Sequence, residues 1–319
     1  MVLSRELSST VVDLLRTQDG LVTRRQLYEA GWSPHDVRWW LRREWSVVLP
    51  GVVASFRGRL SARQQLVAAS LYAGEGAVIT STTAARWRGA VNAPDDGRVH
   101  LFIPLARTLT PNPALVIRRS RRPDPKRLRR GCLVFASAAR SFADAARDAP
   151  SARDARAVVI EAVQRELVTL EELRAELDDG PRCGSALLRA GIDAAASGAW
   201  SVPEHDLLQV LQRSGRFPVV WANPVLQAPD GTRLPTPDCW LDDVGLAIQV
   251  HSRRHHFGVK DWEHTLHQDG VFAEYGVPVI AITPHQLRAN PSDVLARVGR
   301  AHAARRGLAR PNVLATPRV

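Results

Sequence analysis

The sequence has little of several features that define common protein classes. It contains no run of about 18 consecutive apolar residues, so no transmembrane helix is expected, and its polar start, residues 1–6, lacks the apolar core of a signal peptide. Its cysteines, Cys132, Cys183 and Cys239, are odd in number and scattered, with no pair at the spacing of a metal site. We therefore expect a cytoplasmic protein rather than a membrane protein or a disulfide-linked secreted one.

Lysine is also scarce, because only Lys126 and Lys260 are found among 43 basic residues. What the chain does have is positive charge, with a net value of +11. This charge is concentrated: residues 59–131 carry 14 basic and 4 acidic side chains, whereas residues 132–200 carry 8 and 11. A concentrated excess attracts a polyanion and releases its counterions on binding, although a basic segment can also serve only as a solubilising surface.

The first 58 residues combine three predicted helices with a hairpin. Apolar spacing predicts helices over residues 4–16, 24–30 and 34–44. Two short apolar runs on either side of Pro50-Gly51 predict a tight hairpin. This order predicts a winged helix-turn-helix domain over residues 1–58, and the alternative is a small helical domain used for protein contact.

The predicted helix over residues 34–44 is the expected recognition helix. Ser33 is a suitable N-cap for it and Pro34 suits its first position, while Thr23 is a suitable N-cap for the preceding helix. A recognition helix presents its polar face to the major groove. The expected DNA contacts on that face are His35, Arg38, Arg42 and Arg43.

Residues 59–200 alternate predicted helices and strands, which indicates a basic mixed α/β domain. Strands are expected over 78–83, 99–104, 115–118 and 132–136, with helices between and after them.

The segment from Arg118 to Arg130 holds eight basic residues in thirteen. Pro123 and Pro125 make it a loop rather than a helix, and such a loop can reach DNA phosphates. The expected backbone contacts are Arg118, Arg119, Arg121, Arg122, Lys126, Arg127, Arg129 and Arg130.

Residues 201–319 have the predicted order αβββαβα. The expected helices and strands are a helix over 202–214, strands over 219–227, 237–241 and 246–250, a helix over 261–275, a strand over 277–282 and a helix over 291–306. The strand over 246–250 is apolar enough to be central in a sheet. Together with the first 200 residues, this predicts a multi-domain α+β or α/β fold.

Five segments after residue 200 form a set. They are Ser201-x-Pro203-Glu204, Pro237-Asp238, Gln249-Val250-His251-Ser252, Arg253-Arg254-His255-His256 and Asp261-Trp262. With this set, residues 201–300 resemble the PD-(D/E)XK endonuclease-like domains related to very-short-patch repair nucleases.

Two further segments lie before residue 200. They run from Leu21-Val22-Thr23-Arg24 to Gly51-Val52 and from Ser137 to Asp144. With them, residues 1–200 resemble the winged-helix, AbiEi-antitoxin-like proteins of actinobacteria, in which such a domain is often fused to a nuclease-like one.

The resemblance implies a nuclease site that is degenerate in this chain. In that fold, carboxylates from adjacent strands hold Mg²⁺, which activates water for phosphodiester cleavage. Where the family pattern has an acidic pair on the third strand, this chain has Gln249 and His251. Glu204 and Asp238 remain, although Glu204 equally suits the first turn of a helix as a dipole-stabilising acid. We therefore expect weak Mg²⁺ binding, a vestigial site and no cofactor.

Three histidines follow the same strand. His251, His255 and His256 would lie near Asp238 and could bind Zn²⁺, Mn²⁺ or Ni²⁺. We favour the alternative that they are polar surface or phosphate contacts, because their spacing has no metal specificity.

These patterns predict a sequence-specific protein that binds double-stranded DNA, a transcriptional repressor associated with the nucleoid. The alternatives are a metal-dependent DNA endonuclease with an altered site, and the antitoxin of a toxin–antitoxin pair, which the resemblance alone suggests. The sequence is compatible with a homodimer and with a small-molecule effector of unknown class.

Overall fold

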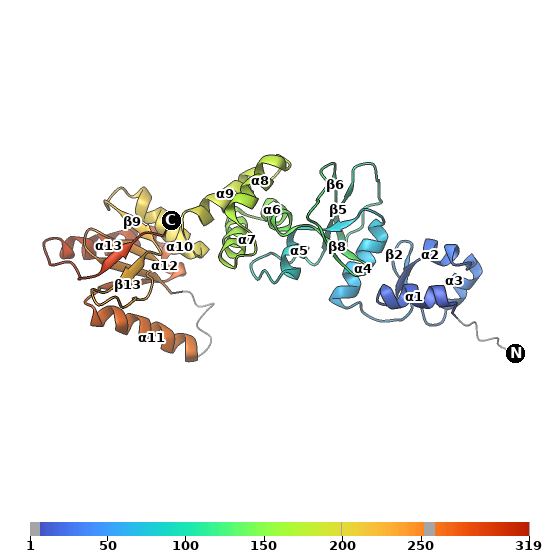
Figure 1. The fold of residues 1–319 in the computed structure, drawn as a ribbon, viewed down its shortest axis with the longest axis horizontal. Helices are drawn as coiled ribbons and strands as arrows, with labels where there is room; N and C mark the ends of the chain where they lie inside the picture. Colours follow the sequence, from blue (N-terminus) through green and yellow to red (C-terminus); the bar gives the residue numbers. More distant parts are fainter. Residues whose placement is uncertain (1–6, 199, 252–258, 319) are drawn as a thin grey trace. The chain divides into compact units, whose positions relative to one another are not determined.

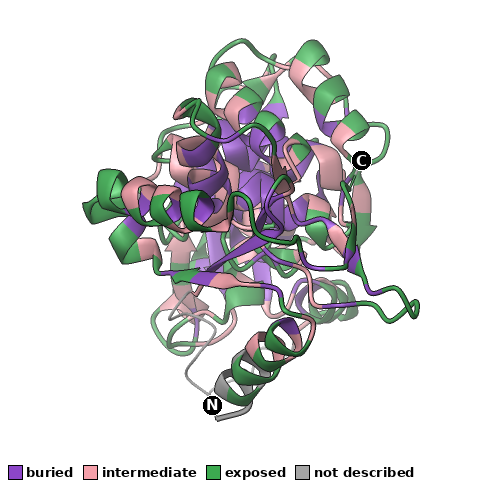
Figure 2. Cartoon of the chain, turned by 90° about the vertical axis from the view of Figure 1, so that its left-hand side faces the viewer, coloured by how far each residue is buried: buried purple, intermediate pink, exposed green. Residues whose placement is uncertain are grey.

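A computed structural model describes residues 7–198, 200–251 and 259–318, with the backbone alone for part of the helix that follows residue 258 (Figure 1). These residues form thirteen helices and fourteen strands in four sheets, which confirms the predicted mixed α and β architecture. Within the described residues, no helix is both long and apolar enough to cross a membrane. Figure 2 shows many helices that are green and exposed on one side and pink or purple on the other.

The chain forms two compact units. Unit 1 comprises Met1–Pro150 and Glu171–Ser185, and unit 2 comprises Ser151–Leu170 and Ala186–Val319. This division differs from the three domains predicted at 1–58, 59–200 and 201–319.

The N-terminal part of unit 1 is a helical cluster on a three-stranded antiparallel sheet. Its elements are α1 Ser9–Thr17, β1 Leu21–Thr23, α2 Arg24–Glu29, α3 Pro34–Leu41, β2 Ser46–Leu49 and β3 Val52–Ala54. The strand order is β1-β3-β2. Thr23 and Ser33 cap α2 and α3 with complete capping boxes, so both predicted N-caps are confirmed.

Side chains of this small sheet alternate between two cores. Val22 and Val53 pack with the helices and with Trp45, whereas Leu21 and Val52 face the core formed by the next part of the chain. One face of this sheet therefore closes a core made within residues 1–58, and the other face packs against the core of the next part of the chain.

The remainder of unit 1 is built on a five-stranded sheet of order β6-β5-β4-β8-β7. Its elements are α4 Ala62–Ala73, β4 Val78–Ile79, α5 Ser81–Trp87, β5 Val99–Pro104, β6 Leu115–Ser120, β7 Leu128–Arg130, β8 Leu133–Phe135, α6 Ala138–Arg147 and α8 Leu170–Asp179. Strand β5 pairs in parallel with β6, and β4 pairs in parallel with β8. Because β6 and β7 are the first and last strands in this order, the connection between them joins the two opposite edges of the sheet.

The two faces of this sheet differ in chemistry. On one face, Leu101 and Ile103 pack against α4 in an apolar core. On the other, His100, Phe102 and Arg118 face α6, and the Arg140 guanidinium of α6 lies 4.2 Å from the centre of the Phe102 ring. This second face supports a polar network.

Several predicted boundaries in unit 1 are wrong. Helix α3 ends at Leu41, because the Trp40 carbonyl accepts from three successive N–H groups, those of residues 43–45, and turns the chain. The strand predicted over 78–83 ends at Ile79, since Ser81 adopts a positive φ of 55° and starts a helix. The predicted loop over 118–130 contains the end of β6 and all of β7, and only residues 121–127 lie outside strands.

Unit 2 holds a four-stranded sheet of order β13-β12-β11-β9. Its elements are α7 Ala152–Gln164, α9 Ser185–Ala196, α10 Val202–Arg213, β9 Val220–Ala222, β10 Val225–Gln227, β11 Cys239–Leu241, β12 Leu246–Val250, α11 Val259–Glu274, β13 Val279–Ile282, α12 Pro284–Ala289, α13 Pro291–Arg305 and β14 Leu314–Thr316. Strands β9, β11 and β12 are antiparallel neighbours, whereas β12 and β13 are parallel. Leu208 of α10 and Val298 of α13 pack on one face of the sheet, and Phe272 of α11 packs on the other.

The strand predicted over 219–227 is two strands in two sheets. Asn223 has a positive φ of 46° and precedes Pro224, so the strand cannot continue through them. Strand β10 then pairs with β14, which the sequence did not predict.

Candidate functional site

The surface of α3 carries two of the predicted DNA contacts. His35 and Arg38 are exposed on this helix, whereas Val37 is buried in the core behind it. Arg42 and Arg43 are also exposed, but they lie just beyond the last residue of the helix. The four residues thus share one stretch of surface that has a helical and a non-helical part.

A tryptophan cluster supports this surface. The rings of Trp32, Trp40 and Trp45 contact one another, with centres 5.4 to 6.2 Å apart, and Trp39 meets the edge of Trp40 at 5.1 Å. The Arg43 guanidinium lies 3.8 Å above the Trp39 ring, and it also donates to the Trp39 carbonyl. Such stacking holds an arginine in one orientation without neutralising its charge.

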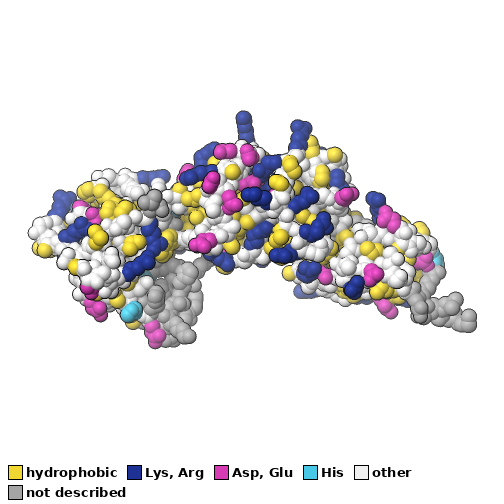
Figure 3. Space-filling view, in the orientation of Figure 1, with side chains coloured by type: hydrophobic (Ala, Val, Ile, Leu, Met, Phe, Trp, Pro, Cys, Tyr) yellow, Lys and Arg dark blue, Asp and Glu magenta, His cyan; other side chains and the backbone are white. Residues whose placement is uncertain are grey.

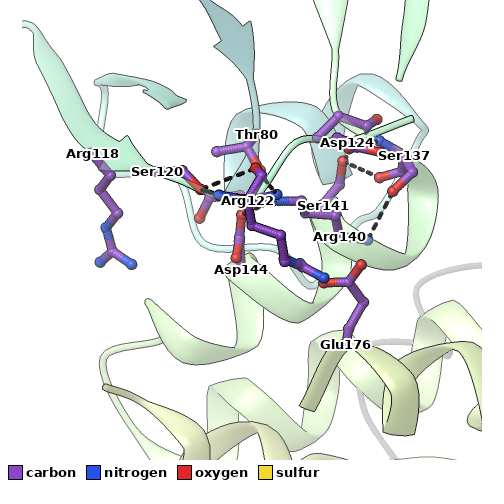
Figure 4. Close-up of polar contacts among 12 residues, drawn as sticks. Thr80, Arg118, Ser120, Arg122, Asp124, Ser137, Arg140, Ser141, Asp144 and Glu176 are labelled. Atoms are coloured by element: carbon purple, nitrogen blue, oxygen red, sulfur yellow. Dashed lines mark hydrogen bonds and ion pairs between the residues drawn. The ribbon is translucent and has the colours of Figure 1, made fainter. Parts of the chain in front are cut away.

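The eight basic residues of the segment 118–130 fall into two groups. Arg118 forms an ion pair with Asp148. Arg122 forms one with Glu176, and these two side chains lie next to each other in Figure 4. The other six are exposed, and none is within ion-pair distance of a carboxylate in the described part of the chain. Figure 3 shows dark blue basic side chains spread over the face of unit 1 that is in view. Six residues thus remain available to a polyanion, namely Arg119, Arg121, Lys126, Arg127, Arg129 and Arg130.

The ion pairs belong to a buried polar network around α6. The Asp144 carboxylate accepts a hydrogen bond from the Thr80 hydroxyl at 2.8 Å and lies 3.4 Å from the Arg147 guanidinium. Burial raises the pKa of Asp144, and the Arg140 guanidinium opposes this effect. In the same network, Arg140 donates to the Ser120 hydroxyl at 2.9 Å (Figure 4).

Two aspartates fix the basic segment to the rest of unit 1. The Asp148 carboxylate accepts from the Ser81 hydroxyl at 2.7 Å while it pairs with Arg118. Asp124 is buried within the segment, and its carboxylate accepts from the Ser137 N–H at the start of α6 at 2.7 Å. The sequence analysis assigned no role to these aspartates, although Asp124 is the one acid among the arginines.

Unit 2 contains the residues expected of a vestigial nuclease site. Glu204 lies in the first turn of α10, where its carboxylate accepts from the Trp200 N–H and the Ser201 hydroxyl, both at 2.8 Å. The side-chain amide of Asn223 donates to the same group at 3.2 Å. These contacts are those expected for the structural alternative, in which Glu204 is an acid that stabilises the first turn of a helix.

Asp238 lies beside Glu204. It directly precedes β11, and the register of β11 with β12 places it opposite Gln249. The Val250 N–H donates to Asp238 Oδ2 at 2.5 Å. Burial raises the pKa of Asp238 well above its usual range, and the nearby charge of Glu204 raises it further.

The structure brings three of the four vestigial residues together, because Gln249 is buried on the strand next to Asp238. His251 follows β12 and is half-buried, and its N–H donates to the Ile282 carbonyl at 2.8 Å. His255 and His256 lie outside the described residues. Nowhere in the described chain do three or more His, Cys, Asp or Glu side chains form a group suited to a metal ion.

The acids of this pair do not fit Mg²⁺. A hard cation needs several anionic oxygens directed at it. Here both Glu204 oxygens receive hydrogen bonds from protein donors, and Asp238 is a buried acid that is difficult to ionise. Gln249 adds one neutral carbonyl oxygen. Glu204 and Asp238 therefore act as hydrogen-bond acceptors within the fold and do not form a set of metal ligands.

No family model matches the chain, and no curated protein is similar to it in sequence. Among solved structures it is similar to one described as the crystal structure of RV2827C protein from Mycobacterium tuberculosis, with 19% sequence identity and a TM-score of 0.40. That alignment covers 57% of this chain and 76% of the other. A likeness at this level carries no argument, so the expected relation to AbiEi-like proteins and repair nucleases stays a prediction.

The raised pKa of Asp238 predicts a pH dependence of stability. A carboxyl group whose folded-state pKa is raised contributes stability at low pH, and this contribution is lost as pH rises from the unfolded-state value through the folded-state value. Asp238→Asn should therefore increase the free energy of unfolding at pH 8 relative to pH 4, by about 1.4 kcal/mol for each unit between the two pKa values. Urea unfolding at both pH values measures this change.

Asp193→Asn is the matched control, because Asp193 is an exposed aspartate of the same unit. It should leave the pH dependence unchanged. An identical pH profile for wild type and Asp238→Asn would show that Asp238 ionises as freely in the folded chain as in the unfolded one.

Proposed function

We propose that this protein binds double-stranded DNA sequence-specifically as a transcriptional repressor, in the cytoplasm and associated with the nucleoid. The observation that carries the proposal is the exposed basic surface of α3 and its C-terminal end, formed by His35, Arg38, Arg42 and Arg43. His35 and Arg38 project from a short helix whose other face is fixed in a tryptophan core, and Arg42 and Arg43 follow its last residue. That arrangement suits a helix that enters the major groove.

The element order supports a winged helix-turn-helix. Three helices and three strands follow in the order α1-β1-α2-α3-β2-β3, and the sheet order β1-β3-β2 makes β2 and β3 a terminal hairpin. The hairpin turns at Pro50 and Gly51, both exposed, and Gly51 has a positive φ of 78° with open space around it. This turn is suited to lie along the DNA backbone as a wing.

The six unpaired basic residues supply a second DNA-binding surface. Arg121, Lys126 and Arg127 lie in the connection between the two sheet edges, and this connection is anchored by the buried Asp124. An anchored basic segment holds its charges in place, so less conformational entropy is lost when it binds phosphates. In this proposal α3 selects the sequence and the segment binds the backbone.

Arg38→Ala should weaken binding to the preferred site by about 1–3 kcal/mol, because one bidentate arginine–guanine contact contributes that much discrimination. The preferred site is first selected from random duplexes with the wild-type chain. Fluorescence anisotropy then compares the variant on the selected site and on a scrambled duplex of equal length.

Arg16→Ala on α1 is the control, since Arg16 is an exposed arginine of the same cluster that pairs with Asp13. It should bind like wild type, and both variants should keep the wild-type melting temperature. Equal affinity of Arg38→Ala and wild type for the selected site would remove α3 from the proposed interface.

The double variant Arg121→Gln/Arg127→Gln should bind all sequences more weakly and with a smaller salt dependence. Each lost phosphate contact lowers the slope of log K against log salt by about 0.9, so the pair should lower it by about 1.8. Arg174→Gln/Arg182→Gln is the control, because these two arginines are exposed outside the basic segment. A slope equal to that of wild type would mean that the basic segment faces away from DNA.

For residues 201–319 we propose a PD-(D/E)XK-like domain that serves as an additional surface for binding DNA or protein. The order of α10, the antiparallel strands β9, β11 and β12, the helix α11 and the parallel strand β13 supports this assignment. The adjacent acids Glu204 and Asp238 favour a metal-dependent endonuclease as the second candidate. Their hydrogen bonds and the neutral Gln249 oppose it.

The wild-type chain should show no Mg²⁺-dependent cleavage of plasmid DNA, because its site offers too little negative charge to hold the ion. Side chains two residues apart in an extended chain point to the same side, so residues 249 and 251 should share one side of the sheet. The double variant Gln249→Glu/His251→Asp should therefore restore metal binding, which titration calorimetry would detect. Robust cleavage by the wild type that Asp238→Ala abolishes would establish the endonuclease instead.

A further inference from the structure

A hollow of about 370 Å³ lies beside the edge strand β6 in unit 1. The half-buried side chains of Ile117 on β6 and Leu109 form its apolar floor, with the buried Ile103 of β5 and Leu115 of β6 beneath them, and the loop from Thr108 to Asn112 contributes its wall. Its size is within the range of small-molecule sites, and its floor is apolar as such sites commonly are.

The wall of this hollow is held in place by side chains of other elements. The Tyr72 hydroxyl of α4 donates to the Thr110 carbonyl at 2.6 Å. Arg107 donates to the Glu75 carbonyl at 2.8 Å, and the Asn112 side chain accepts from the Ala114 N–H at 3.0 Å. The hollow therefore exists before any ligand arrives, which lowers the entropic cost of binding.

One charged side chain, Arg119, lines the hollow. Arg119 lies opposite Ile103 in the register of β5 and β6, on the same strand face as Ile117. Its neighbour Arg118 points to the other face, where Asp148 neutralises it. No acidic residue lines the hollow, and no carboxylate of the described residues is within ion-pair distance of Arg119. An apolar floor with an unpaired guanidinium suits a ligand with an apolar body and one anionic head.

We infer that this hollow binds a small amphipathic carboxylate. The apolar body of the ligand lies on Ile117 and Leu109, and its carboxylate pairs with Arg119. The hydroxyls of Thr108 and Thr110, which also line the hollow, are suitable second donors to the head group.

The site also suggests how the protein is regulated, in a step that rests on the proposed function. Arg119 is one of the six basic residues assigned to DNA phosphates. A carboxylate that occupies Arg119 removes this residue from the DNA, so ligand and DNA weaken each other's binding by the same factor. The ligand would thus act as an inducer that releases the repressor.

The test uses octanoate as the probe and octanamide as its neutral counterpart, with the full chain and without DNA. Titration calorimetry should detect binding of octanoate to the wild type, and octanamide should bind more weakly. Arg119→Gln should lower octanoate affinity about tenfold to hundredfold, which is the usual effect of losing a charge-assisted hydrogen bond. Arg129→Gln, on the opposite edge strand β7, is the matched control and should bind octanoate with the wild-type affinity.

A second variant guards against an indirect effect of the first. Thr108 is exposed in the wall, so Thr108→Asp adds a negative charge there and leaves the packing of the core unchanged. This charge should lower the affinity for octanoate but not the affinity for octanamide. Failure of octanoate to bind at millimolar concentration overturns the site, and so does equal binding by Arg119→Gln and wild type. The anisotropy measurement of DNA binding is then repeated with saturating octanoate. If octanoate binds the chain but leaves the DNA affinity unchanged, the site stands and its role as an inducer site is overturned. If the chain binds no DNA at all, the proposed function fails while the carboxylate site stands.

Discussion

Unit 1 depends on two buried carboxylates, those of Asp144 in α6 and Asp148 directly after it. Each segment that packs against them must provide a hydrogen-bond donor or a positive charge. Thr80 and Ser81 provide hydroxyls at the turn from β4 into α5, and Arg118 and Arg140 provide guanidinium groups. Removing one partner of a buried ion pair leaves an uncompensated charge and costs about 3–5 kcal/mol. The positive φ of Ser81 is maintained by this network, because the residue's hydroxyl is bound to Asp148.

The same network decides which arginines can act. The sequence analysis treated the eight basic residues of the segment 118–130 as one group, because charge density is all that a sequence provides. The partners of Arg118 and Arg122, Asp148 and Glu176, are 30 and 54 residues further along the chain. The segment with a net negative charge after residue 131 indicated that acids were available, but only the fold determines which of them face the arginines.

Local signals were predicted well and distant ones poorly. The N-caps Thr23 and Ser33, the largely apolar strand β12 and the helix α10 depend on residues a few positions apart, and each was identified. Strands β7 and β14 were missed, because an exposed strand of three residues has no apolar pattern and forms only when a distant partner pairs with it. At the acid pair, the resemblance implied that Glu204 and Asp238 would meet, but the hydrogen bond that Asn223 donates to Glu204 could be seen only in the fold.

The position of the arginine-rich strands has a consequence for self-association. Strands β6 and β7 are the two edges of the five-stranded sheet, and each leaves one row of backbone N–H and C=O groups without a neighbouring strand. Such edges are where two sheets join into larger aggregates. Arg119 on one edge and Arg129 and Arg130 on the other place like charges where a second copy would have to dock, whereas Arg118 is paired with Asp148. Neutralising these arginines should therefore favour edge-to-edge association of the sheet.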